Sequence, residues 1–324
     1  MKNNHITKQL LSIITATALI LGSPVMPPAA VSAEPAGRAA VIEDEESREI
    51  NFNKDWKFLL DETEELDASA KNYNDADWDA VRLPHDFSIT QDFAYSHNGV
   101  QLEAESGFLP GGTGWYRKNV IFPSSYDGKS VILNFDGVYN NAYVYINGTK
   151  IGEHHYGYTN FSFDISDLIT CDGTTENVIA VKAVNEFPSS RWYSGSGIYR
   201  DVTLTVADPV HVALNGTYVT TPELEKQKNG DVTVRVETTV QNDGDAAASA
   251  KVRTSVLDKA GSVVSKSAAE GDISIAAGAA SDLTQELAVT APKLWDYDNP
   301  NLYYVQTEIV SGNKVIDSYT TEFG

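Results

Sequence analysis

Short runs of alternating apolar and polar residues, separated by turn residues, constrain the fold of this chain more than any other feature. Valine, isoleucine, tyrosine, phenylalanine and threonine recur at every second position in residues 130–135, 142–146, 178–184 and 201–206. This is the period of a strand with one buried face. Asn147-Gly148 after the second run predicts a hairpin turn, because both residues accept positive φ. Residues 50–208 sustain no 3.6-residue period, so we expect an all-β sandwich.

A second β-domain is indicated by a change of composition near Asp208-Pro209. Aromatic residues are dense up to Tyr199 and nearly vanish until Trp295, while alanine, serine, threonine and valine take over. Residues 231–240 and 251–257 alternate cleanly, as in an immunoglobulin-like sandwich of about 100 residues. Cys171 is the only cysteine, so that sandwich would have no inter-sheet disulfide. We therefore predict a first domain over residues 50–208 and an immunoglobulin-like domain over 209–324.

The N-terminus has the three parts of a secretory signal. Lys2 and Lys8 come first, an apolar run over residues 10–21 follows, and small residues lead to Ala33, where we expect cleavage. Glycine and prolines in residues 22–28 interrupt the run before it reaches the roughly 18–20 apolar residues of a membrane span. We therefore predict a signal peptide over residues 1–33, a flexible acidic leader over 34–49 and a secreted protein, with a cell-surface location open for a longer form.

The charge of the chain argues against two classes of partner. Signal cleavage removes two lysines and no acidic residue, so the formal net charge of −21 becomes −23. Such a surface suits neither nucleic acid nor an anionic membrane, and solubility explains it most simply. His85 and the adjacent His154 and His155 lack the spacing of metal ligands. We expect no metal site and no cofactor.

The densest group of unusual residues lies in the predicted loop 185–200, between two strands. Loops on a rigid sandwich often carry binding residues. The Arg191 guanidinium offers hydrogen bonds to sugar hydroxyls, and Trp192 offers an aromatic face to the apolar side of a sugar ring. Simple packing of Trp192 and Tyr193 at a domain boundary explains the aromatic residues equally well, so the residues alone leave both explanations open.

Three segments carry a resemblance to a known family. Residues 83–87 (Leu-Pro-His-Asp-Phe), 111–118 and 189–202 resemble, in that order, the N-terminal sugar-binding domain of family 2 glycoside hydrolases. Residues 51–58 and 138–148 are similar to that domain's opening strand and its buried hairpin. Residues 293–296 and 299–303 resemble late strands of the family's immunoglobulin-like second domain. The resemblance covers residues 50–324 and implies a galactose-binding-like jelly roll followed by an immunoglobulin-like sandwich.

The resemblance also implies where the chemistry lies. The family is retaining, and a (β/α)8 barrel supplies its two catalytic glutamates. Asn185-Glu186 precedes the immunoglobulin-like domain and lies on no barrel strand, and Glu103 and Glu105 are more simply solvated. We therefore assign no catalytic residue in residues 1–324.

By position in the family, Arg191 is the strongest candidate for a sugar contact, followed by Trp192 and Asp86. For Asp86 a turn role is equally consistent, with its carboxylate accepting backbone N–H groups.

Two hypotheses about function follow. In the first, the chain is the front of a retaining β-galactosidase-like enzyme, whose partners are a terminal β-galactoside and the enzyme's own catalytic barrel; the chain alone would fold but be inert. In the second, the chain works by itself as a secreted carbohydrate-binding or adhesive module. The residues around Arg191 are galactosidase-like, which favours the first.

Overall fold

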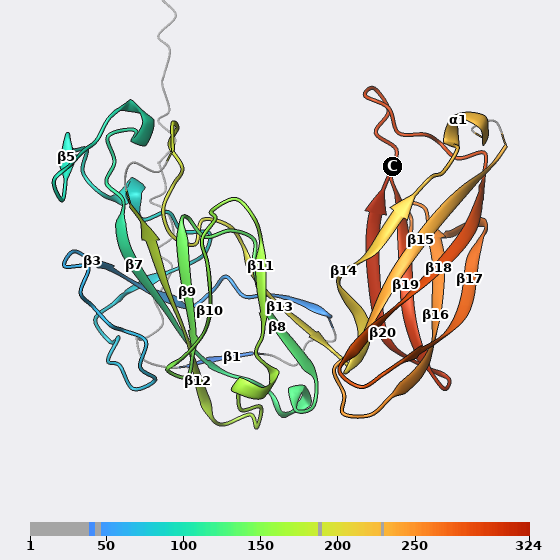
Figure 1. Cartoon of the computed structure of the whole chain (residues 1–324), viewed down its shortest axis with the longest axis horizontal. Coiled ribbons are helices and arrows are strands. Elements are labelled where there is room, and N and C mark those ends of the chain that lie inside the picture. The colour runs from blue at the N-terminus through green and yellow to red at the C-terminus, as the bar shows by residue number, and fades with distance from the viewer. Residues whose placement is uncertain (1–38, 43–46, 187–189, 228–229) are drawn as a thin grey trace, which may run out of the picture. The chain divides into compact units, whose positions relative to one another are not determined.

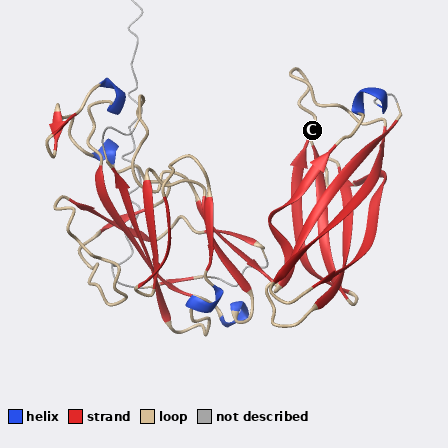
Figure 2. Cartoon of the chain, in the orientation of Figure 1, coloured by secondary structure: helices blue, strands red, loops and turns tan. Residues whose placement is uncertain are grey.

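The structure is a computed structural model that describes residues 39–42, 47–186, 190–227 and 230–324. Strands dominate these residues in both domains, as Figure 2 shows. The helices among the described residues are short: one α-helix, α1 (Leu224–Gln227), and four 3-10 helices of three residues each, Ser88–Thr90, Ala104–Ser106, Ser124–Tyr126 and Ser166–Leu168. The all-β fold class predicted from the sequence is confirmed. No helix of the described residues is long and apolar enough to cross a membrane.

Two large sheets form the sandwich of the first domain (Figure 1), which also carries a separate two-stranded hairpin. The larger has the order β10-β9-β12-β7-β3-β4, with β1 added parallel to β7; the smaller has the order β11-β8-β13-β2. The larger sheet comprises β1 (Ala40–Val41), β3 (Trp56–Asp61), β4 (Asp79–Val81), β7 (Gly112–Ile121), β9 (Asn141–Ile146), β10 (Thr149–His154) and β12 (Glu176–Asn185). The smaller comprises β2 (Glu49–Asn51), β8 (Ser130–Phe135), β11 (Phe161–Asp164) and β13 (Val202–Ala207).

The core of this domain follows from the alternation in the sequence. Along β9 every second side chain is buried, beginning with Ala142, and the buried faces of both sheets join one apolar cluster. Trp56, Phe87 and Phe122 are fully buried in it. The predicted hairpin is confirmed: Asn147 and Gly148 have φ of 51° and 89° and connect β9 to β10.

The second domain is also a sandwich of two antiparallel sheets. One has the order β14-β15-β18 and the other β17-β16-β19-β20. Their bounds are β14 (Val210–Thr220), β15 (Asp231–Asn242), β16 (Ala248–Leu257), β17 (Val263–Ile275), β18 (Ala279–Thr290), β19 (Tyr303–Ser311) and β20 (Lys314–Phe323). Small aliphatic side chains such as Val236, Val252 and Val305 fill its core, as the composition predicts.

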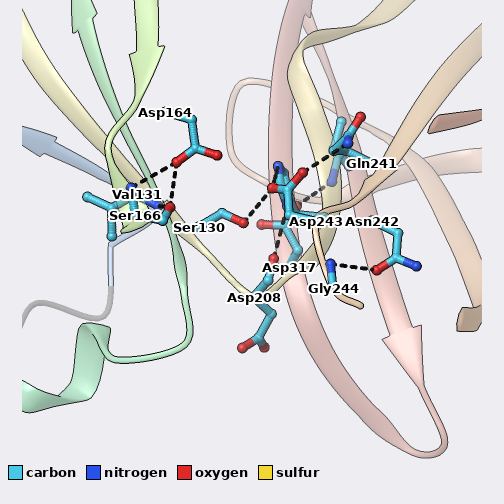
Figure 3. Close-up of polar contacts among 12 residues, drawn as sticks. Ser130, Val131, Asp164, Ser166, Asp208, Gln241, Asn242, Asp243, Gly244 and Asp317 are labelled. Atoms are coloured by element: carbon cyan, nitrogen blue, oxygen red, sulfur yellow. Dashed lines mark hydrogen bonds and ion pairs between the residues drawn. The ribbon is translucent and has the colours of Figure 1, made fainter. Parts of the chain in front are cut away.

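Polar contacts connect residues on either side of the link between β13 and β14. The Ser130 hydroxyl donates a 2.6 Å hydrogen bond to the Asp243 carboxylate, as Figure 3 shows. Arg48 forms an ion pair with the buried Asp317 and donates to the Val212 carbonyl oxygen at 2.5 Å. Side chains of the first domain therefore form polar contacts with residues of the second domain near the segment that connects β13 to β14.

The predicted signal peptide, residues 1–33, lies outside the described residues. Within the predicted leader, residues 34–49, Ala40 and Val41 pair with Val120 and Ile121 of β7. This part of the leader is held by backbone hydrogen bonding at the sheet.

Candidate functional site

The loop over residues 186–201 links the two sheets of the first domain, because β12 belongs to one and β13 to the other. Asn185, the last residue of β12, pairs with Gly112, the first residue of β7. The segment that leads into β7, residues 82–111, therefore reaches the same end of the sandwich as the 186–201 loop. The site is built where these two segments meet.

A chain of buried hydrogen bonds fixes the base of the loop. The Asn185 amide donates to the Ser196 hydroxyl at 2.7 Å, that hydroxyl lies 2.6 Å from the Ser88 hydroxyl, and Ser88 donates to the Pro110 carbonyl oxygen at 2.6 Å. The three side chains that make these bonds are almost completely buried. Buried polar groups that are paired in this way hold a single arrangement, so the loop leaves the sandwich from a defined base.

Gly197 is required at the base by the space around it. Its φ is 96°, and a Cβ atom there would lie 2.1 Å from the Tyr116 hydroxyl oxygen. That hydroxyl is itself 2.9 Å from Nδ1 of His85. Burial raises the pKa of Tyr116 well above its usual value and lowers the pKa of His85. The second glycine of the Ser-Gly-Ser-Gly motif thus allows close contact with the buried Tyr116 hydroxyl and its half-buried partner His85.

Asp86 joins the two segments. One carboxylate oxygen, Oδ1, accepts the backbone N–H groups of Ser88 at 3.0 Å and of Ser196 at 2.9 Å. The other, Oδ2, accepts the Tyr193 hydroxyl at 2.6 Å. Burial and this hydrogen bond raise the pKa of Tyr193, so the phenol stays protonated and remains a donor. The turn-shaping role considered for Asp86 is thus present; its contact with a sugar stays a prediction.

Arg191 and Trp192 are exposed at the outer part of the loop. Trp192 is 58% exposed, and its indole N–H donates to the Tyr158 hydroxyl at 2.6 Å. Tyr158 belongs to the same domain, between β10 and β11. The indole is therefore held in place at its nitrogen while much of its surface stays accessible, which is more specific than general packing at a domain boundary.

A hollow of about 300 Å³ lies next to Arg191. Its lining comprises Gln101, Leu102, Glu103, Glu105, Ser106, Ser190 and Arg191. The Arg191 guanidinium forms no ion pair with a carboxylate of the described residues. Glu103 and Glu105 are exposed, in agreement with the expectation that they are solvated. The lining of the hollow combines a guanidinium, which donates hydrogen bonds, with two carboxylates, which accept them. This combination suits a ligand with several hydroxyls.

The described residues hold no group of three histidine, cysteine, aspartate or glutamate side chains arranged for a metal ion. The two adjacent histidines make separate hydrogen bonds: His154 lies 2.9 Å from the Thr159 hydroxyl, and His155 lies 2.9 Å from the Asn141 amide oxygen.

Sequence reasoning named Tyr193 as a loop residue but not its hydrogen bond to Asp86. It did not identify Tyr158, which holds Trp192, or the exposed aromatic side chains of a hairpin within residues 93–108. The aromatic residues of this hairpin were a signal in the sequence, but their exposure depends on the tertiary fold. Ser189, within the motif on which the resemblance rests, lies outside the described residues.

Models of known protein families match both domains. The model described as the sugar-binding domain of glycosyl hydrolases family 2 matches residues 50–209, and the model described as glycosyl hydrolases family 2 matches residues 210–324. The chain belongs to glycosyl hydrolase family 2. The jelly-roll and immunoglobulin-like sandwiches are thus the sugar-binding and second domains of this family.

The family 2 relatives share this region of their chains. A β-galactosidase of Bacteroides ovatus is 38% identical over 275 residues, which cover 85% of this chain and 31% of that protein. A β-glucuronidase of Formosa agariphila is 33% identical over 305 residues, covering 88% of this chain and 30% of the relative. A solved structure of a family 2 member from Bacteroides cellulosilyticus superposes with a TM-score of 0.78 at 33% identity, covering 86% of this chain and 35% of that one. The chain spans about a third of the length of these relatives.

Proposed function

We propose that this chain is the sugar-recognition part of a secreted family 2 glycosidase that acts on terminal β-galactosides with retention of configuration. The observation that carries the proposal is that an exposed Arg191 and an oriented Trp192 are neighbours on a loop whose base is held by buried hydrogen bonds. In this arrangement the guanidinium donates to sugar hydroxyls and the indole face covers the apolar side of the ring.

The chemical step belongs to a partner domain in this proposal. Retaining glycosidases use a nucleophile and an acid/base carboxyl about 5 Å apart, and in family 2 we expect a (β/α)8 barrel to supply them. The described residues contain only two sandwiches, so the role of this chain is to bind and orient the non-reducing end of the substrate. We expect the chain alone to hydrolyse neither β-galactosides nor β-glucuronides.

A galactoside is preferred over a glucuronide because of the charges around Arg191. Relatives of both specificities match the chain. Glu103, Glu105 and Arg191 line the same hollow, so two carboxylates and one guanidinium set the charge of its lining. A uronate carboxylate would meet a net negative lining, whereas a neutral galactose hydroxyl meets acceptors and a donor.

A chimera tests this proposal. Residues 34–324 would replace the matching third of the Bacteroides ovatus β-galactosidase, and hydrolysis of 4-nitrophenyl β-galactoside would be measured. We expect activity, with Arg191→Ala and Trp192→Ala each lowering kcat/KM by about tenfold, the effect of losing one charge-assisted hydrogen bond or one aromatic contact. Arg235→Ala and Trp295→Ala, exposed residues of the second domain, are the matched controls. Unchanged kcat/KM in both loop variants of a folded chimera would contradict the proposal.

A further inference from the structure

A second group of exposed aromatic side chains lies on the segment that enters β7. Phe93 and Tyr95 are 78% and 83% exposed, and Phe108 is 36% exposed. Exposed aromatic residues that gather in one place usually mark a binding surface. None of them takes part in the Asp86 and Arg191 contacts described above.

This segment has a defined conformation. β5 (Ser96–His97) and β6 (Val100–Gln101) form a two-stranded hairpin that projects from the first domain (Figure 1). Backbone hydrogen bonds of 2.9 Å from Ala94 to Phe108 and from Leu102 to Tyr95 close it at its base. The Tyr95 and Phe108 rings meet edge to face, with centroids 5.7 Å apart. The aromatic surface is therefore preformed.

The aromatic side chains line a hollow of about 200 Å³ together with Ala94 and Gly107. This lining contains no aliphatic side chain larger than alanine. Flat ring faces without aliphatic side chains suit the C–H face of a sugar ring, whose hydroxyl edge remains in water. An apolar protein interface would instead be expected to combine aromatic and aliphatic residues and to exclude charge at its centre.

The aromatic hollow lies next to the hollow at Arg191 along the chain. Gly107 lines the first and its neighbour Ser106 lines the second. The Tyr193 ring packs beside Gly107, because a Cβ atom on Gly107 would lie 3.6 Å from Cδ2 of Tyr193. One segment thus presents polar groups at one end and aromatic faces at the other.

We infer that the Phe93–Tyr95–Phe108 surface is a second sugar subsite, which holds the unit next to the one at Arg191 in a neutral β-linked oligosaccharide. The inference rests on the proposed function, because it takes the Arg191 loop as the first subsite. Glu103 and Glu105 line the hollow at Arg191, where they would accept hydrogen bonds from sugar hydroxyls and repel uronate groups. The chain would therefore bind an oligosaccharide more tightly than a monosaccharide.

Calorimetric titration of the purified chain tests the inference. The probes are β-1,4-galactotetraose and methyl β-D-galactopyranoside. We expect Phe93→Ala and Tyr95→Ala each to raise the Kd for the tetraose about tenfold, the size of one aromatic contact, and to leave the Kd for the methyl galactoside unchanged. Both side chains are mostly exposed, so their removal should leave the fold intact. Tyr297→Ala, at a residue 92% exposed in the second domain, is the matched control.

The outcomes separate the two proposals. Tetraose binding that resists Tyr95→Ala but is lost in Arg191→Ala would overturn the second subsite and leave the proposed function standing. Equal weakening of both probes by Tyr95→Ala would also overturn it. Absence of binding of either probe to the unaltered chain would overturn it as well, while the chimera would still decide the proposed function. Loss of association with a catalytic barrel, without a change in tetraose binding, would assign the surface to a protein partner instead.

Discussion

The Tyr193 hydroxyl donates a 2.6 Å hydrogen bond to the Asp86 carboxylate, although the two residues are 107 positions apart in the sequence. The same carboxylate accepts two backbone N–H groups, one of them from the buried Ser196. The Asp86 carboxylate thus connects the segment before β7 to the loop after β12 by hydrogen bonds.

Removal of this carboxylate should loosen the loop. We expect Asp86→Ala to lower the free energy of unfolding by about 1–3 kcal/mol, because the buried Ser196 N–H loses its acceptor. Urea denaturation measures the change, with Asp167→Ala as an exposed control. A variant as stable as the parent would show that the loop does not depend on Asp86.

Gly197 provides a second test of the loop base. Gly197→Ala places a Cβ atom against the Tyr116 hydroxyl at 2.1 Å, whereas Gly261→Ala, also at positive φ, meets nothing within 4 Å. Both substitutions carry backbone strain of about 1 kcal/mol, and only the first adds a steric clash of about 1–3 kcal/mol. Thermal denaturation should therefore show a clearly lower Tm for Gly197→Ala. Equal Tm values would contradict the close packing at Tyr116.

A buried ion pair holds the loop between β3 and β4 on the sheet. Nε of Arg117 lies 2.9 Å from the Asp75 carboxylate, which also binds Nζ of Lys57 at 2.6 Å. Asp75→Ala leaves Arg117 buried without a counter-ion, so we expect a loss of about 3–5 kcal/mol of stability.

The matched control for this pair is Glu270→Ala, which breaks the exposed Lys251–Glu270 pair and should leave the urea midpoint nearly unchanged. Similar effects of the two substitutions would mean that the Asp75 pair is not buried in solution.

The buried side chain of Lys118 should make the free energy of unfolding depend on pH. Burial lowers the pKa of Lys118 to about 8 in the folded chain, below the usual 10.5 of the unfolded chain. Between these values the unfolded chain binds more protons, so stability should rise with pH, by up to about 1.5 kcal/mol from pH 8 to pH 9.5. Lys118→Met should remove this slope, and the difference between the two chains cancels other titrating groups. If the stability of the parent chain and of Lys118→Met changed with pH in the same way, the lowered pKa of Lys118 would be refuted.

Local patterns were sufficient to predict the sandwiches but not the site. Residues 130–135 coincide with β8, and residues 178–184 lie within β12, because alternation reports directly on one buried face. The Asp86–Tyr193 bond, the Asp75–Arg117 pair and the hollow between Arg191 and residues 101–106 depend on segments that meet only in the folded chain. Arg191 and Trp192 could be proposed from the sequence because they lie in one loop motif, whereas Tyr158 and the hairpin aromatics lie in other segments and carried no such signal; the sugar contacts of Arg191 and Trp192 stay predictions.

In the proposed function this chain recognises a sugar and leaves hydrolysis to a partner domain. This proposal is tested most directly by incubating the purified chain with a chromogenic β-galactoside and titrating galactose into the same sample by calorimetry. We predict no turnover, together with galactose binding that is weakened in Arg191→Ala. Turnover that Arg191→Ala abolishes, or galactose binding that Arg191→Ala leaves intact, would contradict the account.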